Sequence, residues 1–220
     1  MKRSDGGVRI GILMLDTRFP RPPGDIGHPD SFRRYGAEPI YQKVPGATAH
    51  RVVEAAAEGL FEPFVEAGRQ LVARGAQRIG TSCGFLARFQ SELQQALEVP
   101  VISSALLACA DSDRPGVLTF SAESLDDQLL AAAGVPPGTP IEGISAGCEF
   151  HRRIMNDEPT MNWGEAEQNV VEAAMRLVSA HPAVRTIVLE CTNMPVFQSA
   201  IEAATGRPTV DLVRLLTRAN

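Results

Sequence analysis

The sequence lacks the features that mark three common classes of protein: an excess of basic charge, a long apolar run and closely paired cysteines. Lys and Arg together number 21 against 26 Asp and Glu, which gives a formal net charge of −5. This balance excludes the positively charged footprint of a nucleic-acid-binding protein. No apolar run approaches the roughly 20 residues that span a bilayer, so we expect no contact with a membrane.

The cysteines and histidines also lack the spacing of a metal site or a disulfide scaffold. Cys83, Cys109, Cys148 and Cys191 form no C-x-x-C pair, and no two histidines stand at metal-ligand spacing. Isolated cysteines in a chain of this size are typical of a reducing compartment. The first residues, 1–7, contain no apolar segment of a signal peptide. The sequence therefore predicts a cytoplasmic protein without a metal ion.

Apolar runs at regular intervals predict parallel sheets. The run at residues 8–15 is almost continuously apolar, as in strands that are buried on both faces. Segments whose apolar residues recur at helical spacing lie between such runs, for example Leu86, Phe89, Leu93 and Leu97. We expect eight strands, at residues 8–15, 39–44, 78–82, 99–103, 117–121, 141–145, 186–190 and 209–212. Strands that alternate with helices indicate an α/β protein with mainly parallel sheets.

Two segments depart from this alternation and are predicted to be long loops. Residues 18–28 directly follow the first strand, and residues 148–164 carry two adjacent arginines and the single Trp. Long loops in a compact α/β chain are usually functional. We therefore expect these two loops to cover a functional site, and the alternative is that they are surface loops without a function. His28 and His151 lie in these segments and are secondary candidates for contact with the site.

An internal repeat is the most informative feature of the sequence. Cys83 aligns with Cys191 at an offset of 108 residues. A gapless alignment with this offset matches residues 89–91 with 197–199 (both Phe-Gln-Ser), Pro100 with Pro208, and residues 10–12 of the first strand with 118–120. Because only one repetition fits, the pattern excludes a short-period solenoid and indicates a duplicated half.

The duplication predicts two pseudo-symmetric three-layer α/β/α domains. We place the N-terminal domain at residues 1–104 plus 207–220 and the C-terminal domain at residues 105–206. Ligands of open parallel sheets bind beyond the carboxyl ends of the strands. The active site is therefore expected in the cleft between the two domains.

Cys83 and Cys191 each stand at the end of an apolar strand and just before a helix. Pseudo-twofold packing would bring both thiols to one bound molecule, and a helix N-terminus favours the thiolate. Cys109 and Cys148 are not matched by the offset and are interpreted as structural. A redox disulfide between Cys83 and Cys191 stays open as an alternative.

Two opposed thiols suit proton transfer at a carbon next to a carboxylate. A thiolate removes the proton from one face and a thiol returns one to the other face. Backbone amides at the two helix N-termini can hold the substrate carboxylate and stabilise the developing charge. The pattern predicts a racemase or epimerase, and the alternative from another class is a small-molecule binding or redox-sensing protein.

The residues around both cysteines resemble the motifs of the aspartate/glutamate/hydantoin racemase superfamily. These motifs are Thr81-Ser82-Cys83-Gly84-Phe85 and Glu190-Cys191-Thr192-Asn193-Met194-Pro195. The resemblance covers essentially the whole chain and implies Cys83 and Cys191 as the acid/base pair, with no pyridoxal phosphate, metal or other cofactor. It also implies a set of substrate-binding residues: Asp16, Ser82, Gly84, Phe85, Thr119, Ser121, Ala122, Thr192 and Asn193.

The departures from these motifs bear on the substrate. Members that act on glutamate or aspartate commonly have Asn-Thr after the first cysteine and His or Glu two positions after the second, where this sequence has Gly84-Phe85 and Asn193. A hydantoin or an aryl-bearing acid suits Phe85 better than a free acidic amino acid. The resemblance also leaves open an arylmalonate decarboxylase-like or maleate isomerase-like activity. We expect a small carboxylate or hydantoin as partner, and the oligomeric state stays open, a homo-oligomer included.

Overall fold

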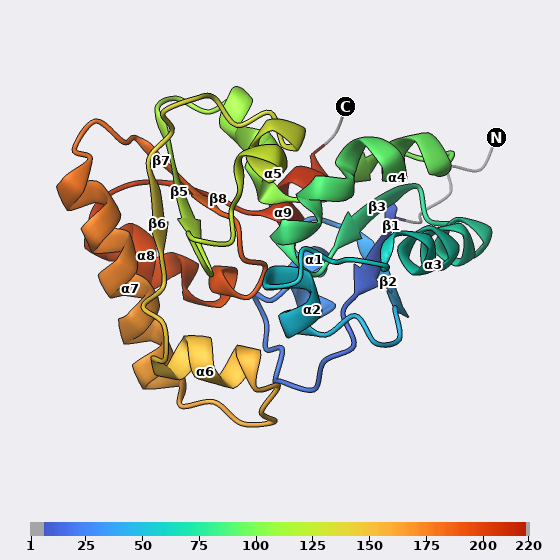
Figure 1. Ribbon diagram of the computed structural model, residues 1–220, viewed down its shortest axis with the longest axis horizontal. Coiled ribbons are helices and arrows are strands. Elements are labelled where there is room, and N and C mark those ends of the chain that lie inside the picture. The colour runs from blue at the N-terminus through green and yellow to red at the C-terminus, as the bar shows by residue number, and fades with distance from the viewer. Residues whose placement is uncertain (1–6, 219–220) are drawn as a thin grey trace.

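All eight apolar runs form strands, and these assemble into two four-stranded parallel sheets. The computed structural model describes residues 7–218 (Figure 1). The strands are β1 (Arg9–Met14), β2 (Glu38–Lys43), β3 (Arg78–Thr81), β4 (Val101–Ile102), β5 (Pro115–Thr119), β6 (Ile141–Gly143), β7 (Thr186–Leu189) and β8 (Thr209–Val210). The α-helices are α1 (Asp30–Arg33), α2 (Ala49–Val53), α3 (Phe61–Ala73), α4 (Gln90–Ala96), α5 (Asp127–Ala132), α6 (Glu149–Met155), α7 (Trp163–Ala180), α8 (Gln198–Thr205) and α9 (Leu212–Thr217). The described residues also form short 3-10 helices, which are η1 (Gly84–Phe89), η2 (Ala105–Ala110) and η3 (Met194–Phe197).

The two sheets repeat one topology. Strand order is β2-β1-β3-β4 in the first sheet and β6-β5-β7-β8 in the second, and all neighbouring strands are parallel. Figure 1 shows the two halves side by side, with helices on the flanks of each sheet. The predicted α/β architecture with two similar halves is confirmed.

Strand pairing shows how the two halves correspond. Ile10 of β1 pairs with Arg78 of β3, and Pro115 of β5 pairs with Thr186 of β7. Residues 78 and 186 differ by the predicted offset of 108, but residues 10 and 115 differ by only 105. The predicted match of residues 10–12 with 118–120 is therefore wrong by three positions, because the connection between the paired strands is three residues longer in the second half.

Helices cover both faces of the first sheet at positions where glycine allows close approach. A Cβ at Gly11 would lie 3.1 Å from the Cβ of Leu71 in α3, and one at Gly80 would lie 2.4 Å from Leu216 in α9. Gly80 pairs with Ile12, the residue after Gly11, so the two glycines face opposite sides of the sheet. The first half is thus a three-layer unit, with α3 on one face and α9 on the other.

The helix that follows the last strand of each half packs on the other half. After β4 the chain enters η2, which packs against β5 and β7 of the second sheet. After β8 it enters α9, which packs against β3 and β4 of the first sheet. The tail that we expected in the N-terminal domain, residues 207–220, is therefore divided in its described part, since β8 pairs with β7 while α9 crosses to the first sheet.

The expectation of a long loop at residues 148–164 is wrong. Residues 149–155 form α6, and α7 already begins at Trp163. A helix of seven residues is too short to show a clear apolar period, and side-chain contacts described below hold it in place. The other segment, residues 18–28, is irregular as predicted.

No helix among residues 7–218 is both long and apolar enough to pass through a lipid bilayer. Most of the N-terminal stretch for which we expect no signal peptide, residues 1–6, lies outside the described residues.

The contribution of a left-handed backbone conformation to stability can be tested at Gly206, at the end of α8. It caps the helix with a left-handed φ of 65°, and no atom lies within 4 Å of the position that a Cβ would occupy. Gly206→Ala adds no clash but forces an L-residue into the left-handed region, so it should lower the free energy of unfolding by about 1 kcal/mol in chemical denaturation.

Gly164 provides the matched control. It lies in the first turn of α7, without a positive φ, and a Cβ there would lie no closer than 3.7 Å to another atom. Gly164→Ala should leave the free energy of unfolding unchanged or raise it. Equal losses in both variants would show that the backbone conformation at Gly206 is not the cause.

Candidate functional site

Cys83 and Cys191 line one cavity between the two halves of the chain. Each thiol stands two residues past the end of its strand, Cys83 after β3 and Cys191 after β7. The cavity is small, with about 20 Å³ open to the centres of water molecules, which is room for one water or two. The described residues that line it are Leu15, Phe19, Ala49, Val53, Ser82, Cys83, Gly84, Phe85, Phe120, Ile154, Glu190, Cys191, Thr192 and Asn193.

The turns that carry the two cysteines pack directly on each other. The Thr192 hydroxyl donates a hydrogen bond of 2.7 Å to the carbonyl oxygen of Ser82. On the opposite side, a Cβ at Gly84 would lie 2.4 Å from the carbonyl oxygen of Glu190, so only glycine fits there. These two contacts join residues more than 100 positions apart in the chain and fix the cysteines around one space.

Both thiols are protonated at neutral pH, contrary to the expectation of stabilised thiolates. Burial raises the pKa of the Cys83 thiol to about 12 and raises the pKa of Cys191 well above its usual value, and the Glu190 carboxylate acts in the same direction. Amides at the starts of η1 and η3, from Phe85 and Asn193, lower both pKa values as expected but have a smaller effect than burial. All four cysteines are free thiols.

Glu190 is a functional candidate that the sequence analysis missed. Its side chain is fully buried and lines the cavity directly before Cys191. Oxygen Oε2 accepts hydrogen bonds from the Thr119 hydroxyl (2.8 Å) and the Phe120 amide (3.4 Å), whereas Oε1 has no hydrogen-bond partner among residues 7–218. A charged residue at the end of an otherwise apolar strand was the available signal, because such a position is buried in a parallel sheet.

A chain of polar contacts leads from Cys191 to the loop at residues 18–28. The Cys191 thiol donates to Asn193 Oδ1 at 3.5 Å, and Asn193 Nδ2 donates to the buried carboxylate of Asp25. Asp25 also accepts from Arg21 at 3.0 Å and from the Gly27 amide at 2.6 Å. Asn193 therefore ties the second cysteine to this loop, and Asp25, which no sequence pattern indicated, holds Asn193 in place.

Four of the residues that the family resemblance implied do not line the cavity. Asp16 accepts from the Gly46 amide at 3.1 Å and forms an ion pair with Lys43, so its carboxylate is engaged by these two residues. Thr119 is directed to Glu190. Ser121 bonds Ser124, and Ala122 packs near Gly143. Their neighbours Leu15 and Phe120, which occupy equivalent positions 105 residues apart, line the cavity instead.

The histidines also lie outside the cavity lining. His151 stacks on Phe120 with ring centroids 4.9 Å apart and so supports the cavity wall from behind. His28 accepts a hydrogen bond from the Asp30 amide. Among residues 7–218, no group of three or more His, Cys, Asp or Glu side chains could hold a metal ion.

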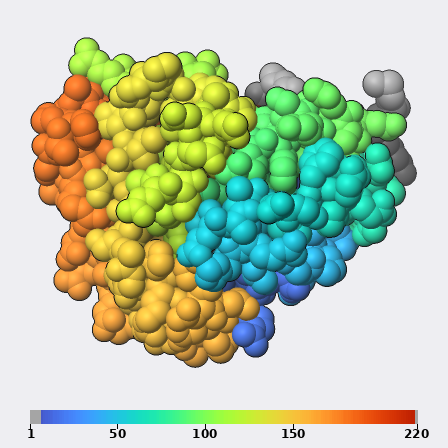
Figure 2. Space-filling model, viewed as in Figure 1, coloured from blue at the N-terminus to red at the C-terminus, as the bar shows by residue number. Residues whose placement is uncertain are grey.

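Three segments cover the cavity. Phe19 comes from the loop at residues 18–28, Ile154 from α6, and Ala49 and Val53 from α2. Helices α2 and α6 contact each other, and Figure 2 shows their atoms, near residues 50 and 150, meeting on the front of the molecule. Asp157 joins the loop to the end of α6, because its carboxylate accepts from the amides of Arg18 and Phe19 and pairs with the Arg18 guanidinium at 3.0 Å.

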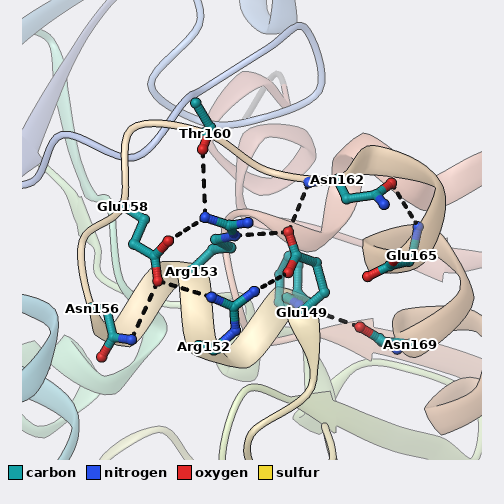
Figure 3. Close-up of polar contacts among 10 residues, drawn as sticks. Glu149, Arg152, Arg153, Asn156, Glu158, Thr160, Asn162, Glu165 and Asn169 are labelled. Atoms are coloured by element: carbon teal, nitrogen blue, oxygen red, sulfur yellow. Dashed lines mark hydrogen bonds and ion pairs between the residues drawn. The ribbon is translucent and has the colours of Figure 1, made fainter.

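An ion-pair network fixes α6 itself (Figure 3). The buried carboxylate of Glu149 accepts from Arg152, from Arg153 at 2.8 Å and from the Asn162 amide at 2.8 Å. Both arginines also pair with Glu158, which follows the helix. We interpreted the adjacent arginines as part of a loop. Their ion pairs instead join α6 to the turn that follows it.

Comparison with known proteins supports the fold and adds sequence relatives. No family model matches the chain. A dimethylsulfoniopropionate lyase of Durusdinium sp. clade D is 28% identical over 224 residues, which cover 93% of this chain and 71% of that protein. Dimethylsulfoniopropionate lyase 7 of Emiliania huxleyi (strain CCMP1516) is also 28% identical, and the match covers 93% of this chain and 64% of the relative.

Among solved structures, allantoin racemase from Klebsiella pneumoniae matches with a TM-score of 0.67 at 16% identity, over 95% of this chain and 86% of the other. Aspartate racemase from Picrophilus torridus matches with a TM-score of 0.56 at 14% identity, over 96% and 91% of the two chains. The chain therefore shares the two-sheet α/β fold of these racemases, which is the fold that the resemblance of the cysteine motifs implies.

Asp157 offers a test of how the cavity is closed. Asp157→Ala removes the bonds that hold residues 18 and 19 against the end of α6, so the cover should loosen and admit reagents. We expect alkylation of Cys83 and Cys191 by iodoacetamide, followed by peptide mass spectrometry, to become several-fold faster.

The control is Asp113→Ala, which removes a surface ion pair with Arg185. Because that pair is exposed, it should leave both labelling rates unchanged. Identical labelling rates in the Asp157 variant and the parent protein would show that this contact does not close the cavity.

Proposed function

We propose that the chain is a cofactor-independent enzyme that transfers protons at the carbon next to a carboxylate or carbonyl group of a small acid. The observation that supports this function is the pair of free thiols, Cys83 and Cys191, on one enclosed cavity. A pair of like groups suits a reaction in which one removes a proton and the other returns one. The simplest outcome is racemisation or epimerisation.

The chemistry of the cavity favours this reaction over a redox exchange. Proton removal next to a carboxylate develops negative charge, and the small, largely apolar space excludes the water that would screen its stabilisation. Because both thiols rest in the protonated form, one of them must lose its proton before it acts as the base. The other is then already the acid that the second step requires.

The cavity walls indicate a substrate with an apolar part. Phe19, Phe85 and Phe120 contribute three aromatic rings, and Leu15, Val53 and Ile154 contribute aliphatic side chains. These walls suit the hydantoin or less polar acid that Phe85 predicts. The covers must open for such a molecule, since the closed cavity holds only a water or two.

Solvent exchange tests the proposed reaction. In D₂O, the protein should exchange the α-proton of a substrate found in a panel of hydantoins, amino acids and 2-substituted acids, observed by proton NMR. Cys83→Ser and Cys191→Ser should each reduce racemisation at least 100-fold, because one face of the carbon loses its acid/base group. Exchange at one face can survive in a single variant.

Cys109→Ala is the matched control, since Cys109 is a buried thiol outside the cavity lining. It should retain full exchange activity. If both serine variants stay fully active, the cysteines are not the acid and base, and if no acid in the panel exchanges, the chain is better explained as a binding protein.

A second candidate function is elimination, which the sequence relatives favour. Both curated relatives described above carry the name dimethylsulfoniopropionate lyase. The first step would be the same, because a thiolate that takes the α-proton leaves an electron pair that can form a carbon–carbon double bond. Breakage of the neighbouring carbon–sulfur bond then releases dimethyl sulfide and leaves acrylate, with the proton on the cysteine.

Dimethylsulfoniopropionate itself distinguishes the two candidates. If the chain is a lyase, incubation with this compound should release dimethyl sulfide, measured by gas chromatography. One of the two cysteine-to-serine variants should then release it at least 100-fold more slowly. Release equal to that in a protein-free sample, together with α-exchange of acids that lack a leaving group, would exclude the lyase and leave the racemase.

A further inference from the structure

Glu190 occupies a place where the two halves of the molecule differ. The residue before each cysteine accepts a hydrogen bond from the amide at the end of the first strand of its half: Ser82 Oγ from Leu15 at 2.8 Å, and Glu190 Oε2 from Phe120 at 3.4 Å. Ser82 completes this role with its single oxygen. Glu190 carries a second oxygen, Oε1, that the structural role does not use.

The unused oxygen lies beside the first cysteine. Oε1 is fully buried and has no hydrogen-bond partner among the described residues, and a Cβ at Gly84 would lie only 2.3 Å from it. Glu190 and Gly84 both line the cavity. An unpaired carboxyl oxygen in an apolar site is costly, so its retention there suggests a bound group that pairs with it.

The surroundings keep this carboxyl neutral up to about neutral pH. Burial raises the pKa of Glu190 to about 7, while the bonds from Thr119 and Phe120 lower it. The titratable groups that face it are the thiols of Cys83 and Cys191, and Asp25 and Arg21 of the loop also act on those thiols. None of these groups is a cation in contact with Glu190, and His151 lies behind Phe120.

The cavity offers few partners for a substrate carboxylate. None of the described residues that line it is Lys, Arg or His, and Arg21 is paired with Asp25. The Thr192 hydroxyl is already bonded to Ser82. A neutral carboxylic acid is a strong hydrogen-bond donor to a carboxylate, and Glu190 Oε1 is the free position from which such a bond can be made.

We propose that Glu190 binds the substrate as a neutral carboxylic acid, with the Oε1 hydroxyl donating a hydrogen bond to the substrate carboxylate. This inference rests on the proposed function, in which the substrate is a small carboxylic acid. The bond strengthens when the α-proton leaves, because negative charge then accumulates on the substrate oxygens. Glu190 thereby replaces the cation that the site lacks.

The role has a defined dependence on pH. Below a pH of about 7 the Glu190 proton is present and the donor is available. As pH rises through this value the carboxyl ionises, the donor is lost and a negative charge faces the substrate carboxylate. Binding of a carboxylate should therefore weaken about tenfold for each further pH unit.

Propionate is a probe that tests this binding without turnover. Its dissociation constant is measured by NMR titration between about pH 6 and pH 9, a range in which propionate stays ionised. In the parent protein the dissociation constant should be flat below about pH 7 and rise about tenfold per unit above it. In Glu190→Gln, whose amide donates without titrating, it should be independent of pH.

Thr119→Val gives a second, independent variant. The Thr119 hydroxyl stabilises the ionised form of Glu190, so its removal should raise the pKa and move the onset of weakening to higher pH. A carboxyl with a purely structural role would give no such shift in propionate binding. This variant keeps the test valid if Glu190→Gln fails to fold.

Three results would overturn the inference. They are loss of propionate binding in a folded Glu190→Gln, equal pH dependence in that variant and the parent protein, and tighter propionate binding as pH rises. Each of them would show that Glu190 does not bind the carboxylate by donating a hydrogen bond from a neutral carboxyl group. If propionate binding weakens with pH as expected but no acid exchanges its α-proton, the result supports Glu190 as a hydrogen-bond donor and contradicts only the proposed function.

Discussion

The contact between the two cysteine-bearing turns is the constraint on which the rest of the molecule depends. The Thr192 hydroxyl meets the Ser82 carbonyl, and Gly84 lies flat against Glu190. This packing leaves no room for a side chain at position 84 and brings two strand ends from different sheets to one space. The identity of the cavity lining follows from it, because the residues on either side of each cysteine come within reach of both.

The same close packing sets the electrostatics of the site. Burial disfavours charge on the three titratable side chains that line the cavity, so Cys83, Cys191 and Glu190 all have raised pKa values. Below a pH of about 7 the resting cavity is therefore nearly uncharged, and the molecule that binds introduces the charge. Stabilisation by fixed dipoles is stronger in such a space than in water, which suits chemistry that passes through a localised anion.

Much of the fold was predictable because the strands are buried on both faces and therefore appear as apolar runs, such as the one that forms β1. The matched cysteines showed the duplication, since each follows a strand by the same distance. The register of β5 was not predictable from the same alignment, because the three extra residues of the second half lie between strands, where insertions leave no pattern.

The site was predictable only where the repeat marked it. Ser82, Gly84 and Thr192 flank the matched cysteines and do line the cavity, whereas Asp16 and Ser121 do not. Glu190 was overlooked because its equivalent is a serine, so the comparison of the halves gave it no weight. Helix α6 was overlooked because the ion pairs of Glu149 with its arginines, rather than an apolar period, define it.

The reciprocal crossing of η2 and α9 has a consequence for the origin of the chain. A single half would leave one face of its sheet bare, because the helix that covers this face belongs to the other half. The arrangement is that of a domain-swapped dimer whose two subunits have been joined end to end. A protein of half this length with the same topology would therefore cover both faces of its sheet only as a symmetric pair, in which each copy lends its last helix to the other.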